Sequence, residues 1–348
     1  MSPDAKGMAV PPQLALIHKL GSLQPHTWST GLILRGAALL GLADHLADGP
    51  RTGAELAEAT GTHPPSLARF LRACAMVGVV ERVGSDSYAL AETGRLLVSD
   101  GPSLRAFVIA VNGPGLMRPW EQVDQALRTG RSVAVDTLGT DLWSYYARHP
   151  AEAFQFLEST IPVSRLTALL LTSLIDLSGV GTVVDVGGCP GVMLADLLDS
   201  LPAARGVLLD LPAMIPHAEK IIGSHPAADR ITFTGGDFLA SVPEGGDLYL
   251  LKHILGDCDE DAARTVVGHC FAAGAPGSRL LLVDWVTSDE PSFAQVTDID
   301  AMVCCGGRIR TGPELIEMLA EAGYRQVRRL AVPGQENDPL AIIEAVRP

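Results

Sequence analysis

Residues 183–191 read VVDVGGCPG, an apolar strand that runs into an acid and a glycine-rich turn. Such turns hold nucleotide-like cofactors in α/β proteins, because glycine permits a tight bend and lets backbone N–H groups approach a ligand. Gly187 and Gly191 fit this use. Cys189 at the middle position does not fit it, and neither does Pro190, which has no N–H to donate. The sequence therefore predicts a cofactor-binding turn in an altered form.

Beyond this turn, segments with strand character alternate with helical stretches as far as the end of the chain. This order predicts an α/β fold with a doubly wound sheet, because helices between successive strands can cover both faces of it. The seven expected strands cover residues 182–186, 206–210, 231–233, 247–251, 279–284, 325–330 and 340–346.

Polar residues follow the expected strands at their carboxyl ends. The second strand ends in Asp210, and an acid at this position can accept hydrogen bonds from ribose hydroxyls. By themselves, the glycine-rich turn and this acid would also suit a dinucleotide dehydrogenase. The third strand is followed by residues 236–238 (GDF), where an acid beside an aromatic suits an adenine amino group and ring face. Lys252 ends the fourth strand and could pair with a carboxylate.

The N-terminal part predicts helices followed by a small β-wing. An apolar helix is expected over residues 32–46, and Thr52 with Glu55 forms a capping-box pattern for the next helix. A helix over residues 66–77 then precedes two short strands between residues 79 and 90. This is the order of a winged helix-turn-helix.

A winged helix allows two interpretations, DNA binding or a packing and dimerisation module. Through residue 100 the chain carries eight Lys/Arg and nine Asp/Glu, and the expected recognition helix has only Arg69 and Arg72 as cations. DNA affinity depends on basic contacts to phosphates, so we favour the interaction module. The alternative, a ligand-sensing regulator, would be excluded by a lack of DNA binding at low salt.

Composition and charge limit the classes of partner. The 348-residue chain is 47% hydrophobic and has a formal net charge of −14, which would repel nucleic acid and acidic membranes. No uninterrupted apolar run reaches the roughly 18 residues needed to span a bilayer. The six cysteines show no metal-ligand spacing. We expect a cytoplasmic enzyme for a small molecule, with reduced thiols and no targeting signal, metal, nucleic-acid partner or membrane partner.

Residues 106–178 predict helices that link the two parts of the chain. The expected helices cover residues 120–127, 141–148, 151–157 and 165–177. Large side chains of this segment could line a substrate cavity over the cofactor, although ordinary core packing is the alternative for each of them. These side chains are Met117, Trp120, Phe154 and Phe156.

Five segments follow one another along the chain: VVDVGG, LLDLP, GGDF, DLYLLKHIL and RIRTGPEL. In these segments and their order, the chain resembles the S-adenosylmethionine-dependent O-methyltransferases of the caffeate and acetylserotonin type, which include bacterial polyketide-tailoring enzymes. The resemblance covers nearly the whole chain. It implies a winged-helix homodimerisation domain over 1–105, a helical linker over 106–178 that lines the substrate pocket, and a Rossmann-like class I methyltransferase domain over 179–348. The cofactor-binding residues that it implies are Asp185, Gly187 and Gly191 near the methionine part, Asp210 and Leu211 at the ribose, Gly236, Asp237 and Phe238 at the adenine, and Lys252 close by.

The chain departs from this family where the chemistry is expected. Members usually follow the leucine of the fourth-strand segment with His-Asp-Trp, and the histidine takes a proton from the substrate hydroxyl; here Gly256 stands in its place. The two acids that flank such a histidine correspond to Asp284 and to Ile309, which cannot orient an imidazole. His253 is common in the family beside the true base, so we interpret it as structural.

Some candidates for acid–base work remain. Asp257 and Asp284 are the nearest, and Glu158 is a weaker one, although a solvated or capping carboxylate is the alternative for each. Met302 and the pair Cys304-Cys305 fall on what the family would make a pocket-lining helix, and we interpret the thiols as small apolar filling rather than as reactive groups.

The sequence thus predicts a homodimeric tailoring enzyme of secondary metabolism that acts on an aromatic or polyketide-like molecule. A general base contributes roughly 10²–10⁴-fold and positioning about 7–11 kcal/mol, so methyl transfer to an ionised or carbon nucleophile could survive the loss of the base. The alternative is a non-methylating cyclase, isomerase or decarboxylase. Because Cys189 and Pro190 alter the turn, we also expect weakened cofactor binding.

Overall fold

The computed structural model describes residues 27–101, 103–332 and 339–348. The chain divides after Asn112 into two units, each of which has its own internal packing. No helix in the described ranges is long and apolar enough to cross a membrane. The expectation about a targeting signal concerns the first residues of the chain, which lie outside the description.

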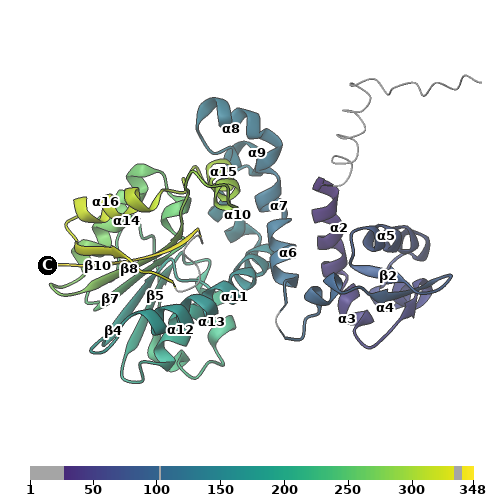
Figure 1. Cartoon of the computed structure of the whole chain (residues 1–348), viewed down its shortest axis with the longest axis horizontal. Helices are drawn as coiled ribbons and strands as arrows, with labels where there is room; N and C mark the ends of the chain where they lie inside the picture. Colours follow the sequence, from purple (N-terminus) through teal and green to yellow (C-terminus); the bar gives the residue numbers. More distant parts are fainter. Residues whose placement is uncertain (1–26, 102, 333–338) are drawn as a thin grey trace, which may run out of the picture. The chain divides into compact units, whose positions relative to one another are not determined.

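The first unit is a helical module (Figure 1). It includes a three-stranded antiparallel sheet in the order β1-β3-β2. Its elements are α2 (Thr27–Leu39), α3 (Leu42–Leu46), β1 (Arg51–Thr52), α4 (Gly53–Thr60), α5 (Pro64–Met76), β2 (Val80–Arg82), β3 (Ser87–Leu90), the 3₁₀ helix η1 (Thr93–Leu97) and α6 (Arg105–Val111). The order of α4, α5, β2 and β3 agrees with the predicted winged helix.

Two local features of this unit follow from single residues. The predicted capping box is present, because Thr52 Oγ1 accepts the Glu55 N–H at 3.2 Å and Glu55 Oε2 accepts the Thr52 N–H at 2.7 Å. The single helix predicted over residues 32–46 is wrong: Gly41 adopts φ +62°, a left-handed conformation that ends α2 and separates it from α3.

The second unit begins with a helical segment. Its elements are α7 (Pro114–Met117), the 3₁₀ helix η2 (Pro119–Gln122), α8 (Val123–Thr129), α9 (Ala134–Leu138), α10 (Leu142–Arg148) and α11 (Pro150–Leu174). The two helices predicted over 151–157 and 165–177 are wrong, because α11 is one helix of 25 residues that contains Pro162. The missing proline N–H does not end it, and Leu157, Ala168 and Leu171 are buried along the helix.

A seven-stranded sheet follows in the order β6-β5-β4-β7-β8-β10-β9. The pairs from β6 to β8 are parallel, and β10 is antiparallel to both of its neighbours. The predicted doubly wound α/β sheet is confirmed. The strands are β4 (Thr182–Val186), β5 (Arg205–Asp210), β6 (Ile231–Gly235), β7 (Leu248–Lys252), β8 (Arg279–Trp285), β9 (Arg325–Arg329) and β10 (Leu340–Val346).

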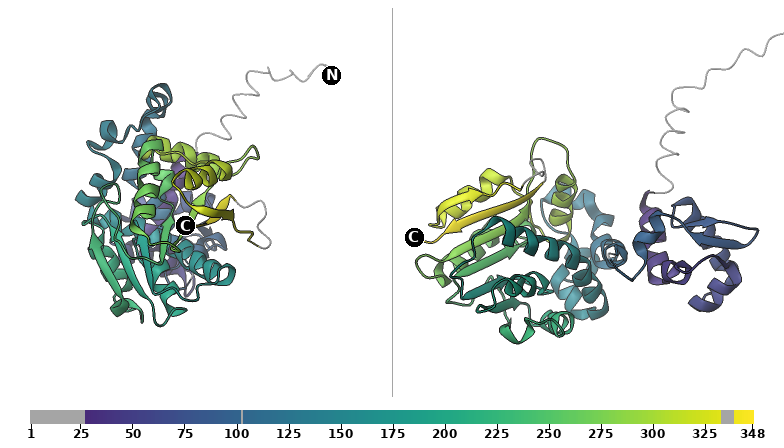
Figure 2. Two further views of the ribbon diagram at one scale, coloured as in Figure 1. Left: turned by 90° about the vertical axis from the view of Figure 1, so that its left-hand side faces the viewer. Right: turned by 60° about the horizontal axis from the view of Figure 1, so that its bottom comes forward.

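Helices cover both faces of this sheet (Figures 1 and 2). Alternate side chains of a strand point to opposite faces, so Val183 packs in the core beneath α11, α12 and α13, whereas Val184 packs in the core beneath α14 and α16. The remaining elements are α12 (Val192–Asp199), α13 (Ile215–Ile222), η3 (Ala228–Arg230), η4 (Leu255–Asp257), α14 (Glu260–Ala273), α15 (Ala294–Cys304) and α16 (Gly312–Glu321).

The parallel strands place their carboxyl ends at one edge of the sheet, where ligands bind in open α/β folds. Four strands have a polar residue at or next to this end: Asp185 on β4, Asp210 on β5, Lys252 on β7 and Asp284 on β8. The topology therefore brings together four polar residues that are far apart in the sequence.

Candidate cofactor and substrate site

The glycine turn links β4 to α12 and needs glycine at more than one position. Gly187 and Gly191 have φ values of +67° and +87°. A Cβ on Gly188 would lie 2.5 Å from Asp185 Cγ, closer than real Cβ atoms approach, so a side chain cannot be added there. The turn is anchored to β5, since the Gly187 and Gly188 N–H groups donate to the Leu209 carbonyl at 2.8 and 3.2 Å.

The altered residue of the turn interacts with the acid at the end of β5. The Cys189 N–H donates to Asp210 Oδ2 at 3.0 Å, and the Leu211 N–H donates to Asp210 Oδ1 at 2.8 Å. The Cys189 thiol lies 3.6 Å from the Met214 carbonyl oxygen. Each oxygen of Asp210 keeps a second lone pair, so the carboxylate can still accept hydrogen bonds from a ligand.

A buried carboxylate lies at the end of β4. Asp185 is 1% exposed, and neither of its oxygens has a hydrogen-bond partner among the described residues. Burial raises the pKa of Asp185 to about 7, although the charge of Lys252 acts in the opposite direction. Burial also lowers the pKa of Lys252, and the charges of Asp185 and Asp284 oppose that shift. Asp185 is therefore a strong candidate to accept hydrogen bonds from a ligand.

The loop after β6 is held in place by a residue that sequence reasoning missed. The Gly236 N–H donates to the Asp210 carbonyl at 2.9 Å, and Asp237 Oδ1 accepts the Leu239 N–H at 2.8 Å. His269 on α14 donates from Nδ1 to the Phe238 carbonyl at 2.9 Å. Only the folded structure brings this histidine to the loop, 31 residues from Phe238.

An apolar side chain fills the space next to Gly256. A Cβ on Gly256 would lie 2.7 Å from Ile309 Cδ1 and 3.4 Å from Asp284 Oδ1. The Gly256 N–H donates to Asp284 Oδ2 at 3.2 Å. Gly256 and Ile309 therefore belong to one packed arrangement, in which an imidazole at residue 256 would require Ile309 to move.

Arg310 fixes the segment that contains Gly256. Its side chain is 2% exposed and donates to the carbonyl oxygens of Leu255, Cys258 and Asp259 at 2.7, 3.3 and 3.0 Å. It also donates from Nε to Glu260 Oε2 at 3.1 Å. Sequence reasoning did not single out this arginine, because most of its partners lie about 50 residues away in the sequence.

His253 lies next to Asp284. It has φ +55°, uncommon for a residue other than glycine, and its ring stacks on Trp285 at 4.9 Å between centroids. The distance of 3.6 Å between His253 Nδ1 and Asp284 Oδ1 is longer than a hydrogen bond. Burial lowers the pKa of His253. These features agree with a neutral, packed imidazole.

Asp257 lies among three cysteine thiols. Burial and the nearby charge of Asp284 raise the pKa of Asp257 to about 7. Burial also raises the pKa of Cys258 and of Cys304 to about 12, and the pKa of Cys305 is raised well above its ordinary value. These thiols stay protonated at neutral pH, as expected of packing groups rather than nucleophiles. The described residues contain no group that could hold a metal ion.

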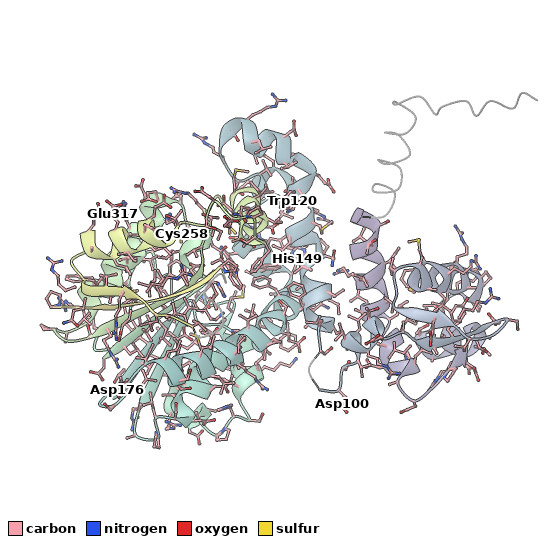
Figure 3. All side chains as sticks on the ribbon, in the orientation of Figure 1. Asp100, Trp120, His149, Asp176, Cys258 and Glu317 are labelled. Carbon is pink, nitrogen blue, oxygen red and sulfur yellow. The ribbon has the colours of Figure 1, made fainter. Side chains whose placement is uncertain are left out.

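An apolar cluster joins the helical segment to α15 and to the glycine turn. Among the predicted pocket residues it includes Trp120, Phe156 and Met302, together with Cys189 and Leu211. Figure 3 labels Trp120, His149 and Cys258, which come from three separate parts of this unit.

Three other candidates are not among the residues of this cluster. Phe154 contacts α13, where the Lys220 Nζ lies 4.1 Å from its ring centroid. Met117 is the last residue of α7 and is partly buried. Glu158 is partly buried on α11.

Two family models match this chain. The model of an O-methyltransferase dimerisation domain matches residues 30–100, and the model of an O-methyltransferase domain matches residues 120–325. The first of these lies within the first unit and the second within the second unit.

Comparison with individual proteins gives similar results. The chain is 35% identical over 322 residues to O-demethylpuromycin-O-methyltransferase of Streptomyces alboniger, covering 90% of this chain and 85% of that protein. It is 31% identical over 323 residues to aclacinomycin 10-hydroxylase of Streptomyces purpurascens, covering 88% of this chain and 83% of that protein. The structure of mitomycin 7-O-methyltransferase superposes with a TM-score of 0.87 at 31% identity, covering 97% of this chain and 99% of that one.

Proposed function

Because this chain belongs to the O-methyltransferase family that carries an N-terminal dimerisation domain, we propose that it is a homodimeric tailoring enzyme of secondary metabolism that binds S-adenosylmethionine. Its substrate is an aromatic or polyketide-like molecule, as the names of its bacterial relatives suggest. The observation that carries the cofactor assignment is the buried Asp185 carboxylate, which has no partner among the described residues and lies against a turn that leaves no space for a side chain at Gly188.

The residues at the carboxyl edge of the sheet fit this cofactor. Asp185, Gly187 and Gly191 would hold the methionine part, and Asp210 with Leu211 the ribose. The adenine would lie by Gly236, Asp237 and Phe238, with Lys252 close to the site. When bound, the cofactor supplies an electrophilic methyl group. The protein contributes orientation and a buried carboxylate that matches a positively charged ligand group.

The buried Asp185 predicts a pH dependence of cofactor binding. Its pKa is about 7, so the carboxylate becomes ionised as the pH rises through neutrality. A free α-amino group stays protonated up to about pH 7.7–8.0. We expect calorimetry to show S-adenosylmethionine binding more tightly as the pH rises from about 6 to 7.5, and Asp185→Asn to bind more weakly with a flat profile. An unchanged slope in the variant would exclude Asp185 as the titrating group.

Cys189 is expected to limit cofactor affinity. Cys189→Gly removes a side chain where the backbone of the turn should approach the ligand, so calorimetry should show tighter binding of S-adenosylmethionine. The same change removes partly buried packing and should lower stability by about 1 kcal/mol. Cys270→Ala, a buried thiol on α14, is the matched control. Unchanged or weaker binding by Cys189→Gly would contradict the prediction.

The acceptor chemistry is constrained by the loss of the base. Gly256 carries no side chain and Ile309 fills the adjoining space, so we propose that methyl transfer depends on positioning an acceptor atom that is already ionised or is a carbon nucleophile. Asp257 and Asp284 are the proposed acid–base groups. Asp257, with a pKa of about 7, can exchange a proton near neutral pH.

Methyl-labelled S-adenosylmethionine tests this function. Incubation with phenols, naphthols and aromatic polyketides should transfer the label to a product and release S-adenosylhomocysteine in equal amount. The rate should rise with pH as an acceptor hydroxyl ionises in solution. Label that enters none of these acceptors would refute methyl transfer.

A second function is supported by one comparison. The relative named aclacinomycin 10-hydroxylase has a name that denotes no methyl transfer, and it is 31% identical to this chain over most of its length. In this alternative, the chain is a cyclase, isomerase or decarboxylase that uses the fold, with or without the cofactor, to position a reactive intermediate. It predicts turnover without S-adenosylhomocysteine, so release of that product in equal amount would refute it.

A further inference from the structure

The apolar cluster that borders the glycine turn adjoins a carboxylate with few partners. Asp300 on α15 is partly buried, and its Oδ1 accepts the Trp120 Nε1–H at 2.7 Å. Trp120 and the neighbours Ile299 and Met302 belong to this cluster, which also includes Cys189 of the glycine turn. Burial raises the pKa of Asp300, and the hydrogen bond from Trp120 only partly opposes this shift.

Other carboxylates of the same region have a clear structural role. Asp298, two residues earlier on α15, accepts the Ile309 N–H at 2.7 Å, and Asp141 caps α10 by accepting the Ser144 N–H at 2.9 Å. Among the residues that the structure describes, no Lys, Arg or His forms an ion pair with Asp300, and its Oδ2 accepts no hydrogen bond.

The contact with Trp120 does not by itself require a carboxylate. An indole N–H is only a donor, and the neutral amide oxygen of an asparagine would satisfy it. A charged group in apolar surroundings costs more than an amide unless a cation balances it. The contact with Trp120 therefore does not explain the charge of Asp300. Its Oδ2 is not fully buried, so a cation or a strong donor of a ligand can reach it.

We propose that Asp300 is a specificity residue that binds a protonated amine of the substrate, while Trp120 holds the carboxylate in position. The inference rests on the proposed function, because it takes the apolar cluster next to the turn as the wall of the substrate site. It narrows the substrate to planar aromatic or polyketide-like molecules that carry a basic amine. A neutral hydroxyl would bind an asparagine equally well, whereas an ammonium group gains from the charge.

Matched aromatic probes test this assignment. The full chain is titrated by calorimetry with aminomethyl and hydroxymethyl derivatives of naphthalene, anthracene and tetracene, with and without S-adenosylhomocysteine. The wild-type chain should bind one of the amines about tenfold more tightly than its hydroxyl partner, the ratio expected for one charge-assisted hydrogen bond. Asp300→Asn should lose this preference and leave binding of the hydroxyl probe unchanged.

Two further variants separate recognition from packing. Trp120→Phe keeps an aromatic ring but releases Asp300 Oδ1, so the preference should fall while a hydroxyl probe still binds. Asp124→Asn removes an exposed carboxylate on α8 and should leave the preference intact. Equal affinity of the wild-type chain for amine and hydroxyl, absence of binding by every amine, or a preference that persists in Asp300→Asn would overturn the proposal.

The outcomes also separate this inference from the proposed function. An amine preference that depends on Asp300, found in a chain that does not bind S-adenosylmethionine, would support the specificity residue and refute the cofactor. Tight cofactor binding without any amine preference would support the cofactor and refute the specificity residue.

Discussion

The double variant Gly256→His/Ile309→Glu is expected to methylate a neutral phenol about 10²–10⁴-fold faster than the natural chain, the usual contribution of a positioned general base. An imidazole on residue 256 would project toward Ile309 Cδ1 and Asp284 Oδ1, which lie 2.7 and 3.4 Å from the Cβ position. The glutamate frees the space of the isoleucine branch and supplies a second carboxylate beside the ring. Transfer of labelled methyl from S-adenosylmethionine to a naphthol measures the effect.

The single variants make this prediction specific. Gly256→His alone must compete with Ile309 for space in a packed site, so we expect it to lower the free energy of unfolding by about 1–3 kcal/mol without a gain in rate. Gly256→Ala is the matched control, because the one short contact of its methyl group is with the flexible end of the isoleucine side chain, so it should cost less. Chemical denaturation and label transfer should be measured on all four proteins.

One result would contradict the coupling between the two positions. If Gly256→His alone were as stable and as active as the double variant, Ile309 would not be filling the space of an imidazole. The double variant tests catalysis separately: if it were stable and bound cofactor but gave no increase in rate, the loss of the base would not be what limits methyl transfer in this chain.

The sequence predicted the sheet well because its signal is local and repeated. Every strand except β9, which reads RQVRR, has apolar residues in alternation or in a short run. Val183 and Val184 pack in the two cores on opposite faces, as this pattern requires. The location of the polar residues could be predicted equally well, because parallel strands place Asp185 and Asp210 at the same end of the sheet. Local chemistry was enough for these features.

The parts that were missed depend on contacts between distant segments. Nothing near Pro162 reveals that α11 continues through it, because burial of its apolar face offsets the lost hydrogen bond. The roles of His269 and Arg310 come from backbone carbonyls that the fold brings to them. Likewise, the sequence predicts that no base lies at residue 256, but only the structure reveals that Ile309 fills the space next to Gly256.

Arg310→Met is expected to lower the free energy of unfolding by about 3–4 kcal/mol, because four hydrogen bonds of a buried guanidinium are lost and each contributes about 1 kcal/mol. The guanidinium donates to four carbonyl oxygens: those of Leu255, Arg308, Cys258 and Asp259. Methionine preserves much of the apolar stem and none of these hydrogen bonds. Urea denaturation with the slope held common to both proteins measures the loss.

Arg308→Met is the matched control, because it removes an arginine two residues away whose ion pair with Glu314 is exposed. Surface pairs of this kind contribute about 0–1 kcal/mol, so the variant should remain close to the natural chain in stability. Arg310→Lys keeps the charge but cannot form the same fork of hydrogen bonds, and it should fall between the two.

The effect of Arg310 should extend to function, because the segment it holds contains both Gly256 and Asp257. At a temperature where Arg310→Lys is fully folded, we expect a lower turnover rate and a shifted pH profile, since Asp257 has its raised pKa only while it is buried. Cofactor affinity should change little, because Asp185 and the glycine turn belong to β4 and α12. A lower affinity with unchanged turnover would instead place the role of Arg310 at the cofactor.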